Sequence, residues 1–156
     1  YGKGIYDTVL EPAKFAGQRV VIIGGGDSAF DWAHQLEGVA KAITLVHRSD
    51  RFRAHQATVD AVMASAQAGR TAIHTFHEIA DVHAEDGRMV GIELKDIKAK
   101  TTKRVDCDVV LPMLGYVSDM GALTQWGLQI EKEEILVNQL METGRTGVWA
   151  AGDVNT

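Results

Sequence analysis

One stretch of the chain has the spacing of a phosphate-binding turn: Gly24-Gly25-Gly26-Asp27-Ser28-Ala29 fits the pattern Gly-x-Gly-x-x-Gly/Ala. The first glycine, Gly24, permits a tight turn, and Gly26 lets the pyrophosphate of a dinucleotide approach the backbone. Ala29 is small enough for the following helix to pack closely on the preceding strand. Backbone N–H groups and the positive end of the helix would then face the phosphates. The pattern indicates a dinucleotide site, with an ordinary glycine-rich turn before a helix as the alternative.

Two acidic residues near the start of the same helix, Asp27 and Asp31, oppose this interpretation. A negative charge at the start of a helix stabilises the helix but repels a phosphate bound there. We therefore expect both side chains to point away from the pyrophosphate.

A cluster of basic residues follows the next apolar run and indicates which dinucleotide would bind. An NAD site places a carboxylate about 20 residues after the glycines to hold the ribose hydroxyls, whereas this chain has His47-Arg48-Ser49 there. Asp50 is the only acidic candidate, and Arg51 and Arg53 flank it. A guanidinium matches the 2′-phosphate that distinguishes NADP from NAD. The cluster therefore favours NADP(H), and the alternative is a solvated basic turn.

The apolar pattern predicts the elements that position these residues. Residues 19–23 form a continuous β-branched run, which is typical of a parallel strand buried on both faces. Helical spacing follows from Ser28 to Gly38, and another strand is expected at residues 42–46. Strand, helix and strand in this order predict a parallel sheet with a right-handed crossover.

The rest of the chain adds a helix over His55–Ala68, a strand at 73–76 and a meander. Apolar residues alternate at 90–94 and are followed by a strand at 105–111, which predicts antiparallel pairing. A further buried strand is expected at 148–151. The expected fold class is α/β: a Rossmann-like parallel sheet with helices on both faces plus an antiparallel β-meander, in a single domain. The helix residues expected to face inward are Ala29, Trp32, Ala33, Leu36, Val59, Val62, Met63 and Ala66.

The composition is that of an ordinary globular chain and argues against several classes. Of the 156 residues, 46% are hydrophobic and 24% charged, and the net charge of −5 argues against a generally basic nucleic-acid-binding protein. No apolar run approaches the ~18 residues that span a bilayer, so we expect no membrane partner. The single cysteine, Cys107, excludes an internal disulfide and fits a reducing, cytoplasmic location.

Three further residues that could do chemistry are expected to have structural roles. Cys107 lies between two aspartates in a predicted buried strand, so we expect a packed thiol with a raised pKa. His74 and His77 are three residues apart on a predicted strand, where they would face opposite sides and could not chelate one metal ion. No metal site is therefore predicted.

Four ordered groups of residues resemble the NADPH domain of thioredoxin-reductase-type flavoproteins, and together they span essentially the whole chain. They are Gly-Gly-Gly-Asp-Ser-Ala at 24–29, His-Arg-Ser-Asp-Arg-Phe-Arg-Ala at 47–54, Gly-Tyr-Val-Ser at 115–118 with Trp-Gly-Leu at 126–128, and Val-Trp-Ala-Ala-Gly-Asp at 148–153.

Within that superfamily the chain departs from thioredoxin reductase itself. That enzyme carries a Cys-x-x-Cys pair ahead of the glycine loop, whereas no cysteine precedes Cys107 here. Exchange with a protein disulfide would therefore lack its nucleophile. The chain most resembles the thioredoxin-reductase-like ferredoxin (flavodoxin)–NADP reductases, whose Trp-Gly-Leu-x-Ile-Glu pattern matches residues 126–131.

The resemblance implies cofactor contacts for particular residues. Arg48 and Arg53 would hold the 2′-phosphate, with His47 beside the adenosine ribose. Ser49 stands where the family often has a second arginine, so the grip on the 2′-phosphate is expected to be weaker or differently shared. The dinucleotide would also contact Gly24, Gly25, Gly26, Asp27, Ser28 and Ala29 around its pyrophosphate, Gly115 and Tyr116 near its nicotinamide, and Asp153 resembles an aspartate that contacts FAD.

From this resemblance we expect an NADPH-binding fragment of a longer, homodimeric flavoenzyme, joined to a flavin domain at residues 1–10 and 150–156. This chain would bind NADP(H), and FAD would bind only to the full-length parent. The parent would exchange hydride between the two cofactors and pass electrons to or from ferredoxin or flavodoxin. No catalytic side chain is expected here. The alternatives are the NADPH domain of another flavoprotein reductase or of a monooxygenase, and a non-catalytic NADP-sensing module.

Overall fold

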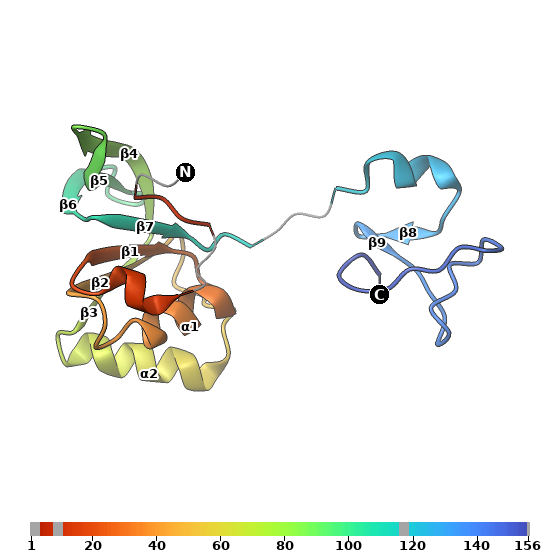
Figure 1. Cartoon of the computed structure of the whole chain (residues 1–156), viewed down its shortest axis with the longest axis horizontal. Helices are drawn as coiled ribbons and strands as arrows, with labels where there is room; N and C mark the ends of the chain where they lie inside the picture. The colour runs from red at the N-terminus through yellow and green to blue at the C-terminus, as the bar shows by residue number, and fades with distance from the viewer. Residues whose placement is uncertain (1–3, 8–10, 116–118, 156) are drawn as a thin grey trace. The chain divides into compact units, whose positions relative to one another are not determined.

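The chain divides into two units, Tyr1–Gly115 and Tyr116–Thr156 (Figure 1). The structure, a computed structural model, describes residues 4–7, 11–115 and 119–155. Whether the two units form the single domain expected over residues 1–156 stays a prediction.

The first unit is built on a four-stranded parallel sheet of order β3-β2-β1-β7. Its strands are β1 (Arg19–Ile23), β2 (Ala42–His47), β3 (Thr71–Thr75) and β7 (Val109–Pro112). Because both faces of the sheet are covered, Val20, Val21 and Ile22 of β1 are all buried. The parallel strand predicted at residues 19–23 is thus confirmed.

The two faces of this sheet are covered by different layers. The helices α1 (Asp27–Gln35) and α2 (Gln56–Gln67) pack against one face, where Phe30 and Leu36 join Val20 and Ile22 in a buried cluster. The antiparallel meander covers the other face, as the two layers in Figure 1 show. The expected sheet and meander are therefore present, but both α-helices lie on one face rather than on both. The meander takes the place of the second helical layer.

The meander consists of β4 (His77–Glu85), β5 (Arg88–Asp96) and β6 (Thr102–Asp106), in the order β4-β5-β6. Ile92 and Leu94 of β5 are fully buried against the sheet. The prediction of one strand at 105–111 is wrong in one respect, because the structure has two strands there, β6 in the meander and β7 in the parallel sheet. The chain passes from β6 to β7 at Cys107 and Asp108.

Most of the residues predicted to face inward on the two helices do so, but each helix departs from the prediction at two positions. Phe30, which the predicted inward face omitted, is fully buried, whereas Trp32 is only half-buried. In α2, Met63 is 39% exposed, and the buried Ser65 bonds to Thr71 at 2.9 Å between their hydroxyl oxygens. The buried stripe of a helix on a sheet is broad, so residues beside the predicted positions can also be buried and those at its margins are partly exposed.

The second unit contains a 3₁₀-helix, η2 (Gly121–Trp126), and the short antiparallel pair β8 (Ile130–Glu131) and β9 (Glu134–Ile135). The buried strand predicted at 148–151 is wrong: Trp149 forms only an isolated bridge with Glu142 and is 63% exposed. Among the residues that the structure describes, no helix has the length and apolar character needed to cross a membrane.

Candidate functional site

The glycine loop follows β1 directly and leads into α1. Gly24 has a φ of 152°, and a Cβ there would collide with the carbonyl oxygen of Met113. A Cβ at Gly25 would collide with the ring of His47, whereas one at Gly26 would meet nothing within 4 Å. The first two glycines are thus required by the fold. The third leaves open space at the start of the helix, which is the space that a bound pyrophosphate needs.

The start of α1 has unpaired donors available for an anion. Gly26 precedes the helix with extended backbone geometry, and no side chain caps the helix there. The first N–H groups of an α-helix have no partner within the helix and lie at the positive end of its dipole. Ala29 is fully buried behind the turn, so the helix packs close to β1. This local geometry fits a phosphate group.

The acidic side chain of Asp27 is engaged away from these amides. Its carboxylate accepts a hydrogen bond from the backbone N–H of His55 at 2.7 Å, at the residue before α2. Asp31 is exposed on the first helix. Asp27 therefore accepts a hydrogen bond from the start of the neighbouring helix, and its side chain points away from the amides of α1, as expected.

The basic segment at the end of β2 folds back against the glycine loop. The ring of His47 fills the space beside Gly25, and the amide of Arg53 donates a hydrogen bond to the Gly25 carbonyl oxygen at 2.6 Å. The ring centroid of Phe52 lies 5.7 Å from that of His47 and 4.8 Å from that of Phe30. One backbone hydrogen bond, the packing of the His47 ring beside Gly25 and the aromatic contacts of Phe52 therefore hold the two predicted clusters together.

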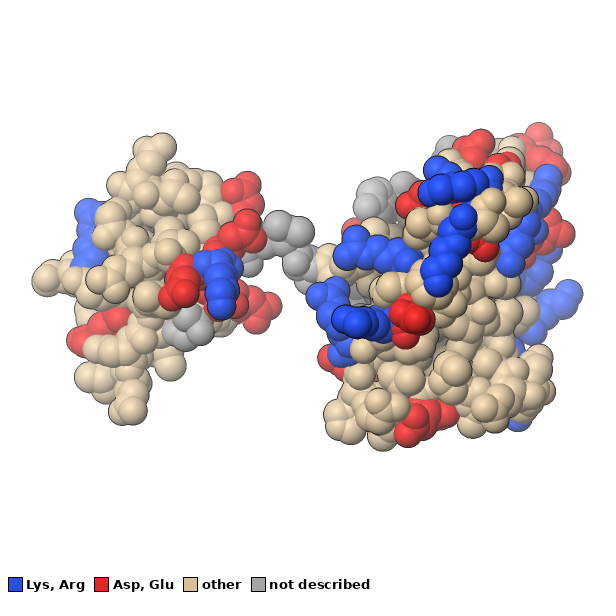
Figure 2. All heavy atoms as spheres, turned by 180° about the vertical axis from the view of Figure 1, so that it is seen from behind, with Lys and Arg blue, Asp and Glu red and all other residues tan. Residues whose placement is uncertain are grey.

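The arginines of this segment present their charge to solvent. Arg48 and Arg53 are exposed, and within the described ranges neither forms an ion pair. Patches of lysine and arginine are visible on the face of the first unit drawn in Figure 2. Guanidinium groups without an internal carboxylate partner are free to bind a phosphate. Together with the open space at Gly26, they provide positive charge and room for a ligand that carries phosphate groups.

The remaining predicted site residues are not all brought to this place. Gly115 follows β7, whose Pro112 pairs with Ile23 immediately before the glycine loop, so it belongs to the same end of the sheet. Tyr116 lies outside the described residues. Asp153 is exposed in the second unit. The structure thus gathers the glycine loop and the basic segment, and leaves the role of Asp153 a prediction.

Two supporting residues of the site were not predicted from the sequence. Phe52 anchors the basic segment through its contacts with Phe30 and His47, and Met113 closes the turn at Gly24. A single aromatic residue among three arginines is a signal that could have identified Phe52. Nothing local points to Met113, because β7 lies far away in sequence.

The expectation that His74 and His77 lie on one strand and face opposite sides is wrong. Phe76 has a positive φ of 57°, which turns the chain between β3 and β4, and the two imidazole centroids come within 5.4 Å. Lys103 Nζ lies 3.1 Å from His74 Nδ1, and burial together with this lysine lowers the pKa of His74. Within the ranges described, no group of three or more His, Cys, Asp or Glu side chains is arranged to hold a metal ion.

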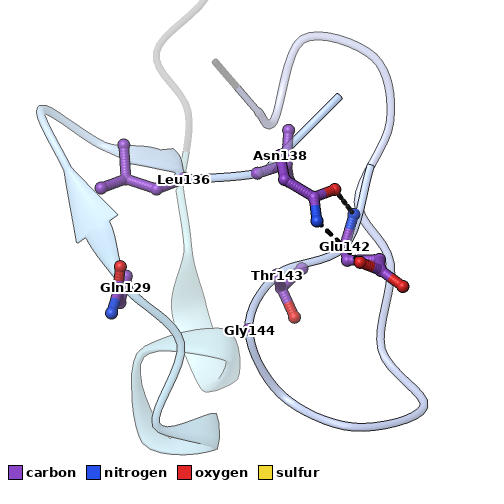
Figure 3. A pocket seen from close by; sticks show the side chains of 7 residues that line it. Gln129, Leu136, Asn138, Glu142, Thr143 and Gly144 are labelled. Atoms are coloured by element: carbon purple, nitrogen blue, oxygen red, sulfur yellow. Dashed lines mark hydrogen bonds between the residues drawn. The ribbon is translucent and has the colours of Figure 1, made fainter. Parts of the chain in front are cut away.

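A pocket of about 290 Å³ lies in the second unit and contains none of the predicted site residues (Figure 3). Asn138 lines this pocket, and its side chain bonds to Glu142. The Asn138 amide nitrogen donates to the Glu142 carboxylate at 2.6 Å, and the Asn138 side-chain oxygen accepts a hydrogen bond from the Glu142 backbone amide at 3.0 Å. These bonds close a tight loop in which the side chains of Asn138 and Glu142 bond to each other. The pocket is lined by Gln129, Leu136, Val137, Asn138, Glu142, Thr143 and Gly144.

Known proteins of similar sequence include several reductases. The chain is 43% identical over 154 residues to ferredoxin–NADP reductase 2 of Shouchella clausii, covering 99% of this chain and 46% of that protein. It is 41% identical over 152 residues to the ferredoxin–NADP reductase of Sulfurisphaera tokodaii, covering 97% and 44%. The chain therefore spans about half the length of the curated relatives it matches.

Solved structures show the same fold. The thioredoxin reductase of T. acidophilum superposes with a TM-score of 0.85 at 24% identity, covering all of this chain and 51% of that one. That of Lactococcus lactis gives 0.82 at 22% identity, covering 98% and 50%. The sequence pattern described as pyridine nucleotide-disulphide oxidoreductase matches residues 4–156. Because this match extends over nearly its whole length, the chain belongs to the pyridine nucleotide-disulphide oxidoreductase family.

Proposed function

We propose that this chain is the NADP(H)-binding part of a flavin-dependent ferredoxin (flavodoxin)–NADP reductase. The observation that carries the proposal is the contact between the two clusters: His47 lies beside Gly25, and Arg53 donates to the Gly25 carbonyl. This contact joins a segment with exposed arginines to a turn that is open at Gly26. The names of the relatives support the reductase activity.

Each part of the site has a defined task in this proposal. The amides at the start of α1 bind the pyrophosphate, because that end of the helix is positive and uncapped. Arg48 and Arg53 bind the 2′-phosphate through charge-assisted hydrogen bonds. His47 lies beside the adenosine ribose. The turn around the pyrophosphate includes Gly24, Gly25, Asp27, Ser28 and Ala29. Near the nicotinamide the proposal places Gly115 and Tyr116, the latter outside the described residues.

The flavin belongs to the proposal for the full-length protein. When bound, it exchanges a hydride with the nicotinamide and handles single electrons for a carrier such as ferredoxin or flavodoxin. The pattern Gly-x-Gly-x-x-Gly/Ala occurs once in this sequence, at the loop assigned to NADP(H). The residues of this chain therefore bind and orient one dinucleotide, and Asp153 is the residue proposed to reach FAD. Assembly as a homodimer and a cytoplasmic location belong to the same proposal.

Titration calorimetry of the chain with NADP⁺ and NAD⁺ tests the proposal. We expect NADP⁺ to bind at least about tenfold more tightly than NAD⁺, and Arg48→Ala to reduce that preference about tenfold, because one charge-assisted contact is worth about tenfold or more. Arg88→Ala is the matched control, since Arg88 is an exposed arginine at the start of β5. Equal affinities for both nucleotides in the unaltered chain would contradict the NADP(H) assignment.

The carrier is tested separately, in the full-length protein. Reduction of ferredoxin or flavodoxin by NADPH distinguishes the proposed reductase from another flavoprotein reductase or a monooxygenase. NADP⁺ binding without reduction of either carrier would retain the dinucleotide site but reject the reductase.

A further inference from the structure

We propose that Arg51 is a third arginine that binds the 2′-phosphate of NADP(H), and that Ser49 is the positioning residue that holds Arg51 in place. This inference rests on the proposed function, because it adds residues to the same phosphate subsite. Ser49 stands where the family often has a second arginine, and in this proposal Arg51 supplies the positive charge that such an arginine would provide.

The hydroxyl of Ser49 is bonded to the backbone of Arg51 on both sides. The Arg51 amide donates to Ser49 Oγ at 3.3 Å, and the same hydroxyl donates to the Arg51 carbonyl oxygen at 3.3 Å. A serine used in this way closes a short turn over residues 49–51. Its side chain is neutral and internally satisfied, so it adds no charge for a phosphate.

His47 provides a second anchor for the same carbonyl group. Its Nε2 lies 3.1 Å from the Arg51 carbonyl oxygen and 3.2 Å from Ser49 Oγ. Because the carbonyl can only accept, a hydrogen bond there requires the proton on Nε2 of His47. The ring of His47 also fills the space beside Gly25. The backbone of Arg51 is therefore tied, through one imidazole, to the glycine loop.

The chain is fixed again just beyond Arg51. The amide of Arg53 donates to the Gly25 carbonyl oxygen at 2.6 Å, and Phe52 packs on Phe30. Arg51 thus lies between two segments that contact the glycine loop, and its side chain is exposed. Fixing the backbone in advance lowers the entropy that binding costs.

The charge of Arg51 is available for a ligand. Arg51 is exposed, and among the residues that the structure describes it forms no ion pair. Segment 47–53 contains three arginines and one aspartate, Asp50. A phosphate monoester carries between one and two negative charges at neutral pH, roughly −1.5 to −2. With Arg51 included, these four residues carry a formal charge of +2, which matches the charge of the 2′-phosphate, whereas Arg48 and Arg53 together with Asp50 leave only +1.

The test uses two small ligands that differ by the phosphate in question. Calorimetric titration with 2′,5′-ADP is compared with titration with 5′-AMP, for the unaltered chain, Arg51→Gln and Ser49→Ala. We expect Arg51→Gln to raise the Kd for 2′,5′-ADP about tenfold and to leave that for 5′-AMP unchanged. Ser49→Ala removes no charge but releases the Arg51 backbone, and should raise the Kd for 2′,5′-ADP about threefold. In a chain that already carries Arg51→Gln, Ser49→Ala should not raise the Kd for 2′,5′-ADP any further.

Arg88→Gln removes the same charge from an exposed end of β5 and serves as the control, and thermal denaturation of every variant verifies folding. Equal effects of Arg51→Gln and Arg88→Gln, with Arg48→Ala still weakening 2′,5′-ADP, would overturn this inference and leave the proposed function intact. A Ser49→Ala effect that persists without Arg51 would overturn the positioning role. An unaltered chain that binds both ligands equally would overturn the inference together with the NADP(H) assignment.

Discussion

The carboxylate of Asp27 accepts a hydrogen bond from the backbone amide of His55 at 2.7 Å, and this bond joins the glycine loop to the start of the second helix. Asp27 is the first residue of α1, and His55 directly precedes α2. The negative charge that opposes phosphate binding in the sequence is thereby directed to a donor of the neighbouring helix. One contact both relieves the conflict and braces the two helices that flank the site.

Asp27→Ala is expected to lower the stability of the first unit. Loss of a side-chain acceptor at a helix start costs about 1 kcal/mol, which corresponds to a fall in Tm of roughly 2–4 °C for a chain of this size. Asp27→Asn keeps an acceptor oxygen and should retain most of the stability. Thermal denaturation followed by circular dichroism measures both variants. An unchanged Tm for Asp27→Ala would show that the bond to His55 contributes nothing.

Gly26→Ala and Gly25→Ala are expected to separate ligand binding from folding. Gly26 has a φ of −99° and open space around it, so an alanine fits the fold and Tm should change by less than about 2 °C. Its methyl group would occupy the space that a pyrophosphate approaches, so the Kd for NADP⁺ should rise at least about tenfold. Gly25→Ala instead meets the ring of His47 and should lower Tm. Unimpaired NADP⁺ binding by Gly26→Ala would argue against the glycine loop as the site.

The sequence was sufficient for those parts of the site that local rules determine. The strand, turn and helix around Gly24 to Ala29 follow from a β-branched run, a positive-φ position and helical spacing, all within twenty residues. The basic segment could be located because it follows β2 directly. The hydrogen bonds between Ser49 and Arg51 could not be predicted from the residue spacing, because they depend on how the turn closes.

The errors occur where a contact between distant residues or an unusual backbone conformation is involved. The chain leaves the meander for the parallel sheet at Asp108, whose carboxylate accepts a hydrogen bond from the amide of Arg19, 89 residues away at the beginning of β1. Local apolar character alone suggested one continuous strand there. His74 and His77 approach each other because Phe76 adopts a left-handed conformation that strand periodicity does not anticipate.

Asp108→Asn is expected to remove a stabilising contact that depends on pH. Arg19 donates to Asp108 from its backbone amide at 2.8 Å and from its guanidinium at 3.1 and 2.6 Å, and these side-chain bonds lower the pKa of the Asp108 carboxyl. A carboxyl whose pKa is lower in the folded state stabilises the fold at pH values above its unfolded pKa, near 3.9. That stabilisation is lost as the pH falls through the pKa of the folded state.

Because the two side chains are more than one-third exposed, solvent screens the pair, and we expect a loss of about 1 kcal/mol at pH 7. Urea unfolding at several pH values should show the difference between Asp108→Asn and the unaltered chain narrowing toward pH 3. Asp31→Asn, at an exposed acid of α1, is the control. A difference that stays constant over this range would contradict the role of the ionised carboxyl.

Cys107 is expected to be unreactive in the folded chain and to make the fold sensitive to alkali. Its side chain is fully buried, with Sγ 3.7 Å from Met89 Sδ, and burial first, then the charge of Asp108, raises the thiol pKa from 9.0 to about 11. Because the thiolate is the nucleophile, alkylation by iodoacetamide at pH 8 should be about 100-fold slower than in the unfolded chain.

The same shift has a definite sign for stability. An acid whose pKa is higher in the folded state leaves the fold unaffected below the unfolded pKa, near 9, and destabilises it as the pH rises toward about 11. The urea midpoint should therefore fall over that interval, and fall less in Cys107→Ala. Lysines and tyrosines that titrate in the same interval affect both proteins, so only the difference between the two curves reports on the thiol. Parallel curves, or alkylation as fast in the folded chain as in the unfolded one, would show that Cys107 is not held as a buried neutral thiol.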